Sequence, residues 1–464
     1  IPHELSTQGP KVAVADVNGD GLEDFYVCGA KGQGGNLFLQ KPDAGFTSSP
    51  DSTVFMTDRN CEDVDAQFFD ANGDGFPDLY VASGGNEYSD NAPELEDRLY
   101  INDGKGHFVK SNTLPHLYEN KSVVRIVDFD KDGHPDIFVG GRANAKIYGM
   151  PPTSYLLHND GKGNFSIVTD EIIPGLSHIG MVTDATWMDI DKDGWPDLIV
   201  TGEWMPPILF KNNHGHFTRE TLTSNDVELS GWWSTVKIAD INGDGFDDLV
   251  LGNYGLNSKL TASSEYPLKM YVGDIMGTGR MVQIMAIAKK GKYFPFLNKE
   301  NLEKGLPYLK KQYLSYGEMA GKTVEEIFGK KLDSTALFKV YTLASTVLIN
   351  DGKGHFTPAV LPAVFQWAPI FAFAAHDFNG DGKMDLLAGG NFYGTEPFEG
   401  RYDAMPLELY RGDGKGGFKA ELPLPSPLDT LSGQVRSIQP IRLGNGKNAM
   451  IVGFNNGPLR LLSY

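Results

Sequence analysis

The stretch DVNGDGLEDFYV, residues 16–27, crowds three aspartates, an asparagine and two glycines into nine positions and then becomes apolar and aromatic. Oxygen-bearing side chains at positions 1, 3, 5 and 9, with glycine at position 6 for a sharp turn, are typical of a calcium loop. Position 12 is Val27 rather than the glutamate of an EF-hand, so we expect a loop between two strands. The predicted metal ligands of this loop are Asp16, Asn18, Asp20 and Asp24.

The same pattern recurs from residues 70, 128, 189, 240 and 377, and position 12 is apolar in each copy. A single loop of this kind can be a solvated Asp/Gly turn, but six copies favour a metal-binding repeat. We therefore expect about six calcium ions, one per intact loop. The further predicted ligands are Asp70, Asn72, Asp74, Asp78, Asp128, Asp130, Asp132, Asp136, Asp189, Asp191, Asp193, Asp197, Asp240, Asn242, Asp244, Asp248, Asp377, Asn379, Asp381 and Asp385.

A second element follows each loop, as in LYINDGKGHF from Leu99 and VLINDGKGHF from Val347. Asn-Asp-Gly between two apolar runs predicts a β-hairpin, because these residues tolerate the positive φ of tight turns. Each module then contains a strand, a metal loop, a strand, a longer connection, a strand, a tight turn and a strand. Four antiparallel strands of this kind form one blade of a β-propeller.

Two further modules bring the number of repeats to eight, but neither has a full set of metal ligands. GDIMGTGRMVQIMAI, residues 273–287, keeps only Asp274, and residues 441–454 keep only the glycines, so we predict both to be metal-free. The tally predicts an all-β fold, a single propeller domain over residues 1–464 with eight four-stranded blades. A seven-bladed ring with one module absorbed is the alternative. The last module shows three clear strands, so the stretch before Lys11 is a candidate for its fourth.

Composition agrees with a repeat protein outside the cytoplasm. Six divalent ions would offset 12 of the 19 net negative charges, and this acidity argues against a nucleic-acid partner. No stretch approaches the roughly 18 consecutive apolar residues that span a bilayer. The chain begins at Ile1 without a methionine, so we expect a piece of a longer protein. Cys28 and Cys61 are too few for a disulfide framework, and either a bridge or two buried thiols fits.

The loops resemble FG-GAP (VCBS) repeats, the calcium-binding propeller repeats that also occur in integrin α-chains. Stretches such as GMVTDATWMDIDKDGWPDLIVTGEWMP, SGWW and GGNFYGTEPFEGRYDA make the chain similar to the C-terminal propeller of ASPIC/UnbV-associated FG-GAP surface proteins of Bacteroidota. The resemblance implies calcium at the intact loops, an extracellular or outer-membrane surface location in a secreted or lipid-anchored protein, and partnership with outer-membrane nutrient transporters. It implies no known reaction.

Strand order divides the residues between two faces. If the strands run strictly up and down, the metal loops and the Asn-Asp-Gly turns share one face, and the long connections between second and third strands occupy the other. Aromatic, amide and guanidinium groups in those connections suit a sugar, a peptide or a protein partner, although they can also seal contacts between blades. The candidate binding residues are Tyr88, Arg142, Tyr148, Glu203, Trp204, Trp232, Trp233, Tyr254, Asn257, Tyr393, Arg401 and Tyr402.

A lysine-rich insertion at residues 290–340, within the predicted sixth blade, has helical spacing and a capping box from Thr323 to Glu326. A lid packed over that blade is favoured over a partner-docking element.

The sequence contains no G-x-S-x-G, no H-E-x-x-H and no His/Cys metal spacing. We therefore expect a non-catalytic, calcium-stabilised binding or scaffold module in a cell-surface assembly of the outer-membrane nutrient-uptake kind, which itself does not span the membrane. The alternative is a glycan- or peptide-processing enzyme with its site in the central funnel.

Overall fold

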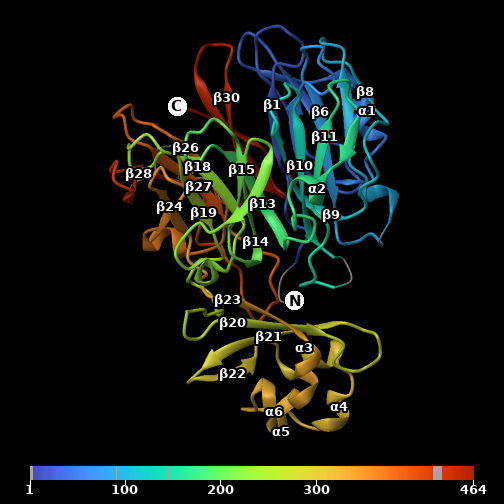
Figure 1. The fold of residues 1–464 in the computed structure, drawn as a ribbon, viewed down its shortest axis with the longest axis vertical. Coiled ribbons are helices and arrows are strands. Elements are labelled where there is room, and N and C mark those ends of the chain that lie inside the picture. The colour runs from blue at the N-terminus through green and yellow to red at the C-terminus, as the bar shows by residue number, and fades with distance from the viewer. Residues whose placement is uncertain (1–3, 90, 145–146, 422–430) are drawn as a thin grey trace.

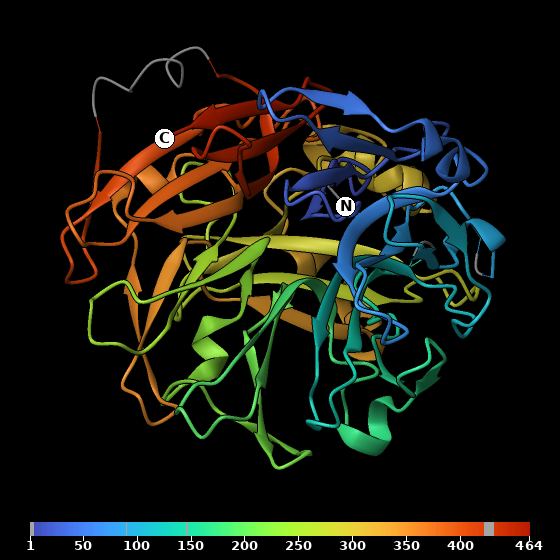
Figure 2. The ribbon, with the colours of Figure 1, turned by 90° about the horizontal axis from the view of Figure 1, so that it is seen from above.

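Short antiparallel strands separated by tight turns build eight sheets in the computed structural model, which describes residues 4–89, 91–144, 147–421 and 431–464 (Figures 1 and 2). The first sheet contains β1 (Val12–Ala15), β2 (Asp24–Val27), β3 (Asn36–Gln40) and β4 (Phe46–Ser48). The second contains β5 (Glu62–Phe69), β6 (Asp78–Gly84), β7 (Arg98–Asn102) and β8 (Phe108–Lys110). The third contains β9 (Asn120–Val127), β10 (Asp136–Ala143), β11 (Tyr155–Asn159) and β12 (Phe165–Ile167).

The fourth sheet contains β13 (Met181–Met188), β14 (Asp197–Met205), β15 (Ile208–Asn213) and β16 (His216–Glu220), with β17 (Gly231–Trp232) paired to β14. The fifth contains β18 (Thr235–Ala239), β19 (Asp248–Gly252), β24 (Thr346–Asn350) and β25 (Phe356–Val360). The sixth contains β26 (Ile370–His376), β27 (Asp385–Gly390), β28 (Glu408–Gly412) and β29 (Phe418–Ala420). The seventh contains β30 (Gln434–Arg442), β31 (Asn448–Asn455) and β32 (Arg460–Ser463).

Seven of the eight sheets close into a ring around a central axis (Figure 2). Their innermost strands pack in the order β1, β5, β9, β13, β18, β26, β30 and back to β1. The propeller fold is therefore confirmed, and the tally of eight modules matches eight sheets. Their arrangement follows the predicted alternative of a seven-bladed ring with one module absorbed, because the eighth sheet is inserted in the fifth, between β19 and β24.

The inserted sheet contains β20 (Leu268–Gly273), β21 (Val282–Lys289), β22 (Lys292–Pro295) and β23 (Ala336–Val340) and lies below the ring in Figure 1. Side chains of successive residues point to opposite faces of this sheet, as in any β-strand. Met270 and Met285 pack into the hydrophobic cluster at the base of the ring, whereas Tyr271 and Ile284 pack against helices. These helices are α3 (Lys299–Gly305), α4 (Leu309–Gln312), α5 (Tyr316–Met319) and α6 (Val324–Phe328), followed by η4 (Gly329–Ser334).

The predicted helical insertion is thus present, and its helix α6 begins with the expected capping box, in which Thr323 and Glu326 bond reciprocally. It packs as a lid, although on the inserted sheet and not on a ring blade. Other short helices lie between strands: η1 (Pro50–Ser52), α1 (Thr53–Met56), η2 (Pro93–Leu95), α2 (Thr169–Ile172), η3 (Asp226–Leu229) and η5 (Ala363–Gln366). Among the described residues, no helix has the length and apolar character needed to cross a membrane.

The expectation that the stretch before Lys11 supplies the fourth strand of the last sheet is wrong. The described part of the stretch before Lys11, residues 4–10, forms no strand, and the seventh sheet has three strands. Side-chain hydrogen bonds add to the packing of β1 on β30 where the ring closes. Asn455 donates to the Gly9 carbonyl at 2.9 Å, and Gln40 Nε2 donates to the Arg442 carbonyl at 3.1 Å. Cys28 and Cys61 are both free and buried, so the structure contains no bridge between them.

Candidate functional site

The six acidic loops each join the first and second strands of a ring sheet, and the aspartate at position 9 anchors each one. Asp24 begins β2 and is fully buried. One of its oxygens accepts from the Gln40 backbone N–H at 2.7 Å and the other from the Val17 N–H at 3.2 Å. The same pair of bonds recurs at the equivalent aspartates, Asp78, Asp136, Asp197, Asp248 and Asp385.

The aspartate at position 1 fixes the turn. Both Asp16 oxygens accept backbone N–H bonds at 2.8 Å, one from Gly19 and one from Gly21, which have positive φ angles of 71° and 84°. Each carboxylate oxygen retains a lone pair beyond the one that the backbone engages. Because the donor set is oxygen alone, it fits a hard cation such as calcium. Acidic groups close enough to hold an ion together occur at the third and fourth loops, which have aspartate at position 3.

Electrostatics also favours a cation in these loops. Burial raises the pKa of Asp24 to about 6, the backbone N–H groups of Gln40 and Val17 lower it, and the carboxylates of Asp20 and Asp16 raise it again. Burial likewise raises the pKa of Asp78 and Asp248 to about 6. A bound cation would stabilise the charged form of such crowded carboxylates.

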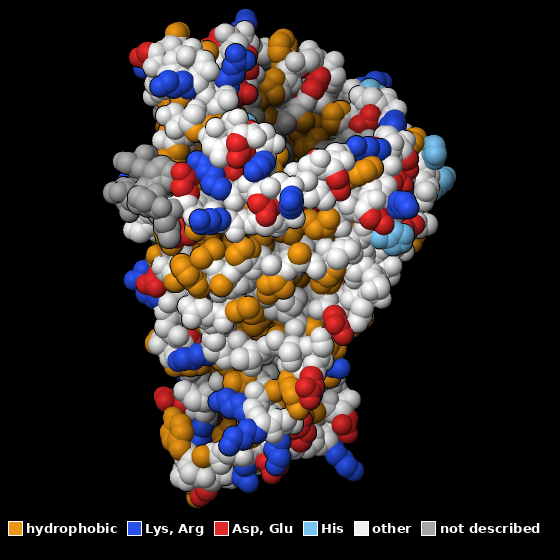
Figure 3. Space-filling view, turned by 90° about the vertical axis from the view of Figure 1, so that its left-hand side faces the viewer, with side chains coloured by type: hydrophobic (Ala, Val, Ile, Leu, Met, Phe, Trp, Pro, Cys, Tyr) orange, Lys and Arg blue, Asp and Glu red, His pale blue; other side chains and the backbone are white. Residues whose placement is uncertain are grey.

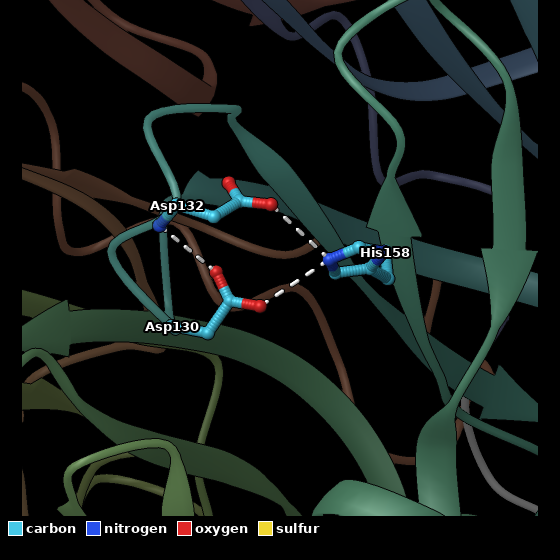
Figure 4. Close-up of side chains that lie close together, drawn as sticks. All are labelled: Asp130, Asp132 and His158. Atoms are coloured by element: carbon cyan, nitrogen blue, oxygen red, sulfur yellow. Dashed lines mark hydrogen bonds and ion pairs between the residues drawn. The ribbon is translucent and has the colours of Figure 1, made fainter.

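In the third loop, a histidine reaches the carboxylates (Figure 4). His158 lies on β11, and its Nε2 is 3.2 Å from an Asp130 oxygen and 3.4 Å from an Asp132 oxygen. These three side chains converge so closely that they could also hold an ion.

The fourth and sixth loops each receive a full positive charge. Lys211 on β15 places its Nζ 2.7 Å from Asp191 Oδ1, 2.8 Å from Asp193 Oδ2 and 3.4 Å from Asp197 Oδ2. Arg411 on β28 places its Nη1 2.7 Å from Asp385 Oδ2. No comparable ion pair reaches the carboxylates of the first, second or fifth loop from any described Lys, Arg or His.

Sequence reasoning missed these three basic residues, although the repeat carries their signal. Each occupies the position directly before the tight turn, as in LLHNDGKGNF, LFKNNHGHF and LYRGDGKGGF. The equivalent residues of the first, second and fifth sheets are Leu39, Ile101 and Ile349. Successive residues of a strand point to opposite sides, so the asparagine bonds to the adjacent sheet while the basic residue before it faces the acidic loop of its own sheet.

The expectation that acidic loops and tight turns share a face is confirmed by contacts between sheets. Asn102, in the turn of the second sheet, donates from Nδ2 to the Val17 carbonyl of the first loop at 2.8 Å. Equivalent bonds join Asn159 to Ala71, Asn212 to Phe129 and Asn350 to Ile190. The longer connections, including the inserted sheet, leave from the opposite end of the strands. We call these surfaces the loop face and the connection face.

On the connection face, most of the candidate binding residues are buried and form no open aromatic surface. Trp204, Trp232 and Tyr254 share a hydrophobic cluster with Met270, Val272 and Met285 of the inserted sheet, whereas Trp233 packs between the fourth and fifth sheets. The buried candidates are Arg142, Tyr148, Glu203, Trp204, Trp232, Trp233, Tyr254 and Tyr402. These buried side chains seal contacts between neighbouring sheets, which agrees with the alternative interpretation.

Two of these buried groups form an ion pair at the axis. Arg142 Nη2 lies 2.6 Å from Glu203 Oε1, and the Tyr148 hydroxyl donates to Glu203 Oε2 at 2.5 Å. The adjoining cavity, which Trp232 and Tyr254 also line, has a volume of about 60 Å³. This space has room for a few water molecules and is too small for a sugar or a peptide.

The remaining candidates reach solvent. Tyr88 is half-buried beneath the Lys31 ammonium, 4.5 Å from its ring, and Asn257 is exposed. Exposed Arg401 stacks over half-buried Tyr393, with its guanidinium 3.8 Å from the ring centroid. Tyr393 lines an open groove of about 580 Å³ on the connection face. Side chains that sequence reasoning did not single out complete its lining, among them Gln434, Asn455, Asn456 and Arg460.

A ring of antiparallel sheets, six of which carry an acidic loop between their first and second strands, defines a β-propeller repeat protein. The family model described as FG-GAP-like repeat matches residues 16–81, 70–139, 147–200 and 189–251. The chain is therefore an FG-GAP repeat protein. The match ends before the sixth loop.

Solved structures similar to this chain include YCF48 from Cyanidioschyzon merolae, at 10% identity and a TM-score of 0.44, covering 100% of this chain and 98% of that one. Saccharomyces cerevisiae Sqt1 is 11% identical with a TM-score of 0.45, again covering 100% and 98%. The V. cholerae biofilm matrix protein Bap1 is 12% identical with a TM-score of 0.37, covering 98% and 89%. No functional conclusion follows from similarities at this level.

Proposed function

We propose that this FG-GAP repeat protein is a non-catalytic, calcium-stabilised binding module of a cell-surface assembly. The observation that carries the proposal is the separation of its two faces. The loop face consists of acidic loops and tight turns held by backbone bonds, whereas the connection face presents the groove beside Tyr393. Rigid scaffolds commonly place recognition on their longer connections.

Calcium is assigned to the first, second and fifth loops. Each offers three aspartates and one asparagine, and no described basic side chain forms an ion pair with their carboxylates. The residues that would hold the ions are Asp16, Asn18, Asp20, Asp24, Asp70, Asn72, Asp74, Asp78, Asp240, Asn242, Asp244 and Asp248. A bound ion would supply positive charge to these carboxylates and link positions 1 to 9 of each loop.

The groove beside Tyr393 favours a polar ligand. Gln434, Asn455 and Asn456 offer amide donors and acceptors, Arg460 offers a guanidinium, and Tyr393 offers an aromatic ring. This combination suits a glycan, a peptide or a loop of a partner protein. The resemblance to surface FG-GAP proteins of Bacteroidota supports an outer-membrane nutrient transporter as the partner and an extracellular location.

The central funnel supports an enzyme less well. Its carboxylates Asp65 and Asp184 both pair with the Arg125 guanidinium on β9. Their oxygens also accept backbone N–H bonds from Val124 and Val236 at 3.0 and 2.9 Å. Carboxylates held in this way serve as structural ion pairs between blades, and neither is placed as a free acid or base.

Binding to a glycan array and to a peptide library tests the proposal. Tyr393→Ala is expected to weaken any ligand found by about tenfold, whereas Asp351→Ala, in a tight turn of the loop face, leaves affinity unchanged. A ligand whose affinity falls only with the loop-face variant would contradict the assignment. Circular dichroism of both variants controls for unfolding.

A further inference from the structure

The six acidic loops differ in the side chain that the neighbouring strand directs at them. In the fifth sheet this residue is Ile349 on β24, and in the fourth it is Lys211 on β15. Both precede the asparagine that binds the adjacent sheet, Asn350 and Asn212, so their positions are equivalent. One loop of this matched pair faces a hydrocarbon side chain and the other an ammonium group.

The Lys211 ammonium lies within the fourth ligand set. It contacts carboxylates from positions 3, 5 and 9, those of Asp191, Asp193 and Asp197, at 2.7 to 3.4 Å. Lys211 is 7% exposed and Asp197 is fully buried, whereas Asp191 is half-buried and Asp193 lies at the surface.

We propose that Lys211 supplies the cation of the fourth loop, which therefore takes no calcium in the native protein. The inference rests on the proposed use of calcium by the fifth loop, and it lowers the expected number of bound ions by one. At this loop, the lysine before the tight turn takes the place that a bound ion would occupy.

Geometry and charge both support the exclusion. Calcium binds carboxylate oxygens at 2.3 to 2.6 Å, and the same oxygens lie at hydrogen-bond distance from the ammonium. The two cations would therefore occupy nearly the same place. For calcium to enter, Lys211 would have to leave the loop, and three hydrogen-bonded ion contacts would be lost. The fifth loop imposes no such exchange, because Ile349 carries no charge.

A reciprocal exchange tests the proposal. Purified chain is dialysed against calcium, and bound ions per chain are measured by metal analysis. Lys211→Met is expected to gain one ion relative to the wild type, and Ile349→Lys to lose one. An unchanged ion count in Lys211→Met would overturn the proposal.

Terbium, a calcium substitute, locates the new site through Trp195, the position-7 residue of the fourth loop. Emission excited through tryptophan is expected to appear in Lys211→Met and to disappear when Trp195→Phe is added. Wild-type emission that Trp195→Phe abolishes would overturn the proposal, because it would place an ion in the native fourth loop.

A milder pair of variants avoids dependence on the folding of Lys211→Met. Asp193→Asn and Asp244→Asn change position 5 of the fourth and fifth loops. The first is expected to leave the ion count unchanged and the second to lower it by one. Loss of an ion in Asp193→Asn would overturn the proposal. Absence of calcium from the wild type would instead contradict the proposed function, and terbium emission confined to Lys211→Met would still support the lysine assignment.

Discussion

Replacing Asn102 with alanine removes a bond network that joins two blades. Its side chain is 1% exposed and makes four hydrogen bonds. Nδ2 donates to the carbonyls of Val17 at 2.8 Å and Pro77 at 3.1 Å, and Oδ1 accepts from Gly104 at 3.1 Å and Gly106 at 3.2 Å. At about 1 kcal/mol per bond, Asn102→Ala should lower the free energy of unfolding by about 3 to 4 kcal/mol.

Urea unfolding followed by tryptophan fluorescence, at one fixed calcium concentration, measures this loss. Asn213→Ala is the control, because that exposed asparagine makes a single 3.4 Å bond to Thr218 and should cost less than about 0.5 kcal/mol. Equal free energies of unfolding for the two variants would refute the view that the turn asparagines fasten neighbouring blades.

Three further outcomes are expected. Excess chelator should lower the melting temperature, because the crowded aspartates then repel one another, and an unchanged melting curve would contradict the calcium assignment. Trp204→Ala should destabilise the chain by about 3 to 5 kcal/mol, since its ring packs 5.4 Å from Trp232 beneath the inserted sheet; a neutral effect in thermal unfolding would contradict that packing. Burial raises the pKa of Glu399 from 4.5 to about 7. The folded state then keeps a proton that the unfolded chain releases, so this group alone should lower stability by up to about 3 kcal/mol as pH rises from about 4.5 to 7. Glu399→Gln should therefore reduce the fall in unfolding free energy measured across that range, while the part contributed by other buried carboxylates such as Asp24 and Glu62 remains.

The repeat made the blades predictable. Acidic loops and Asn-Asp-Gly turns are local features, and strand alternation alone places both on one face, as the bond from Asn102 to Val17 confirms. The helical insertion was predictable for the same reason, because the capping box at Thr323 depends on residues three positions apart. The metal ligand set remains a prediction from that local pattern.

Long-range contacts were not predictable from one sequence. The module from Asp274 repeats the strand pattern, yet it joins β19 to β24 as an insertion and lies outside the ring. That placement covers Trp204 and Trp232, which composition alone suggested as an open binding platform. The groove lined by Tyr393 and Arg460 likewise combines residues from connections far apart in the chain.

The most direct test of a calcium-stabilised propeller is a crystal structure of the chain equilibrated with calcium, with anomalous difference density measured at the acidic loops. Peaks are expected among the side chains of the first, second and fifth loops, next to Asp16, Asp70 and Asp240. A map without peaks at these three loops would contradict the proposal that calcium holds the loop face together.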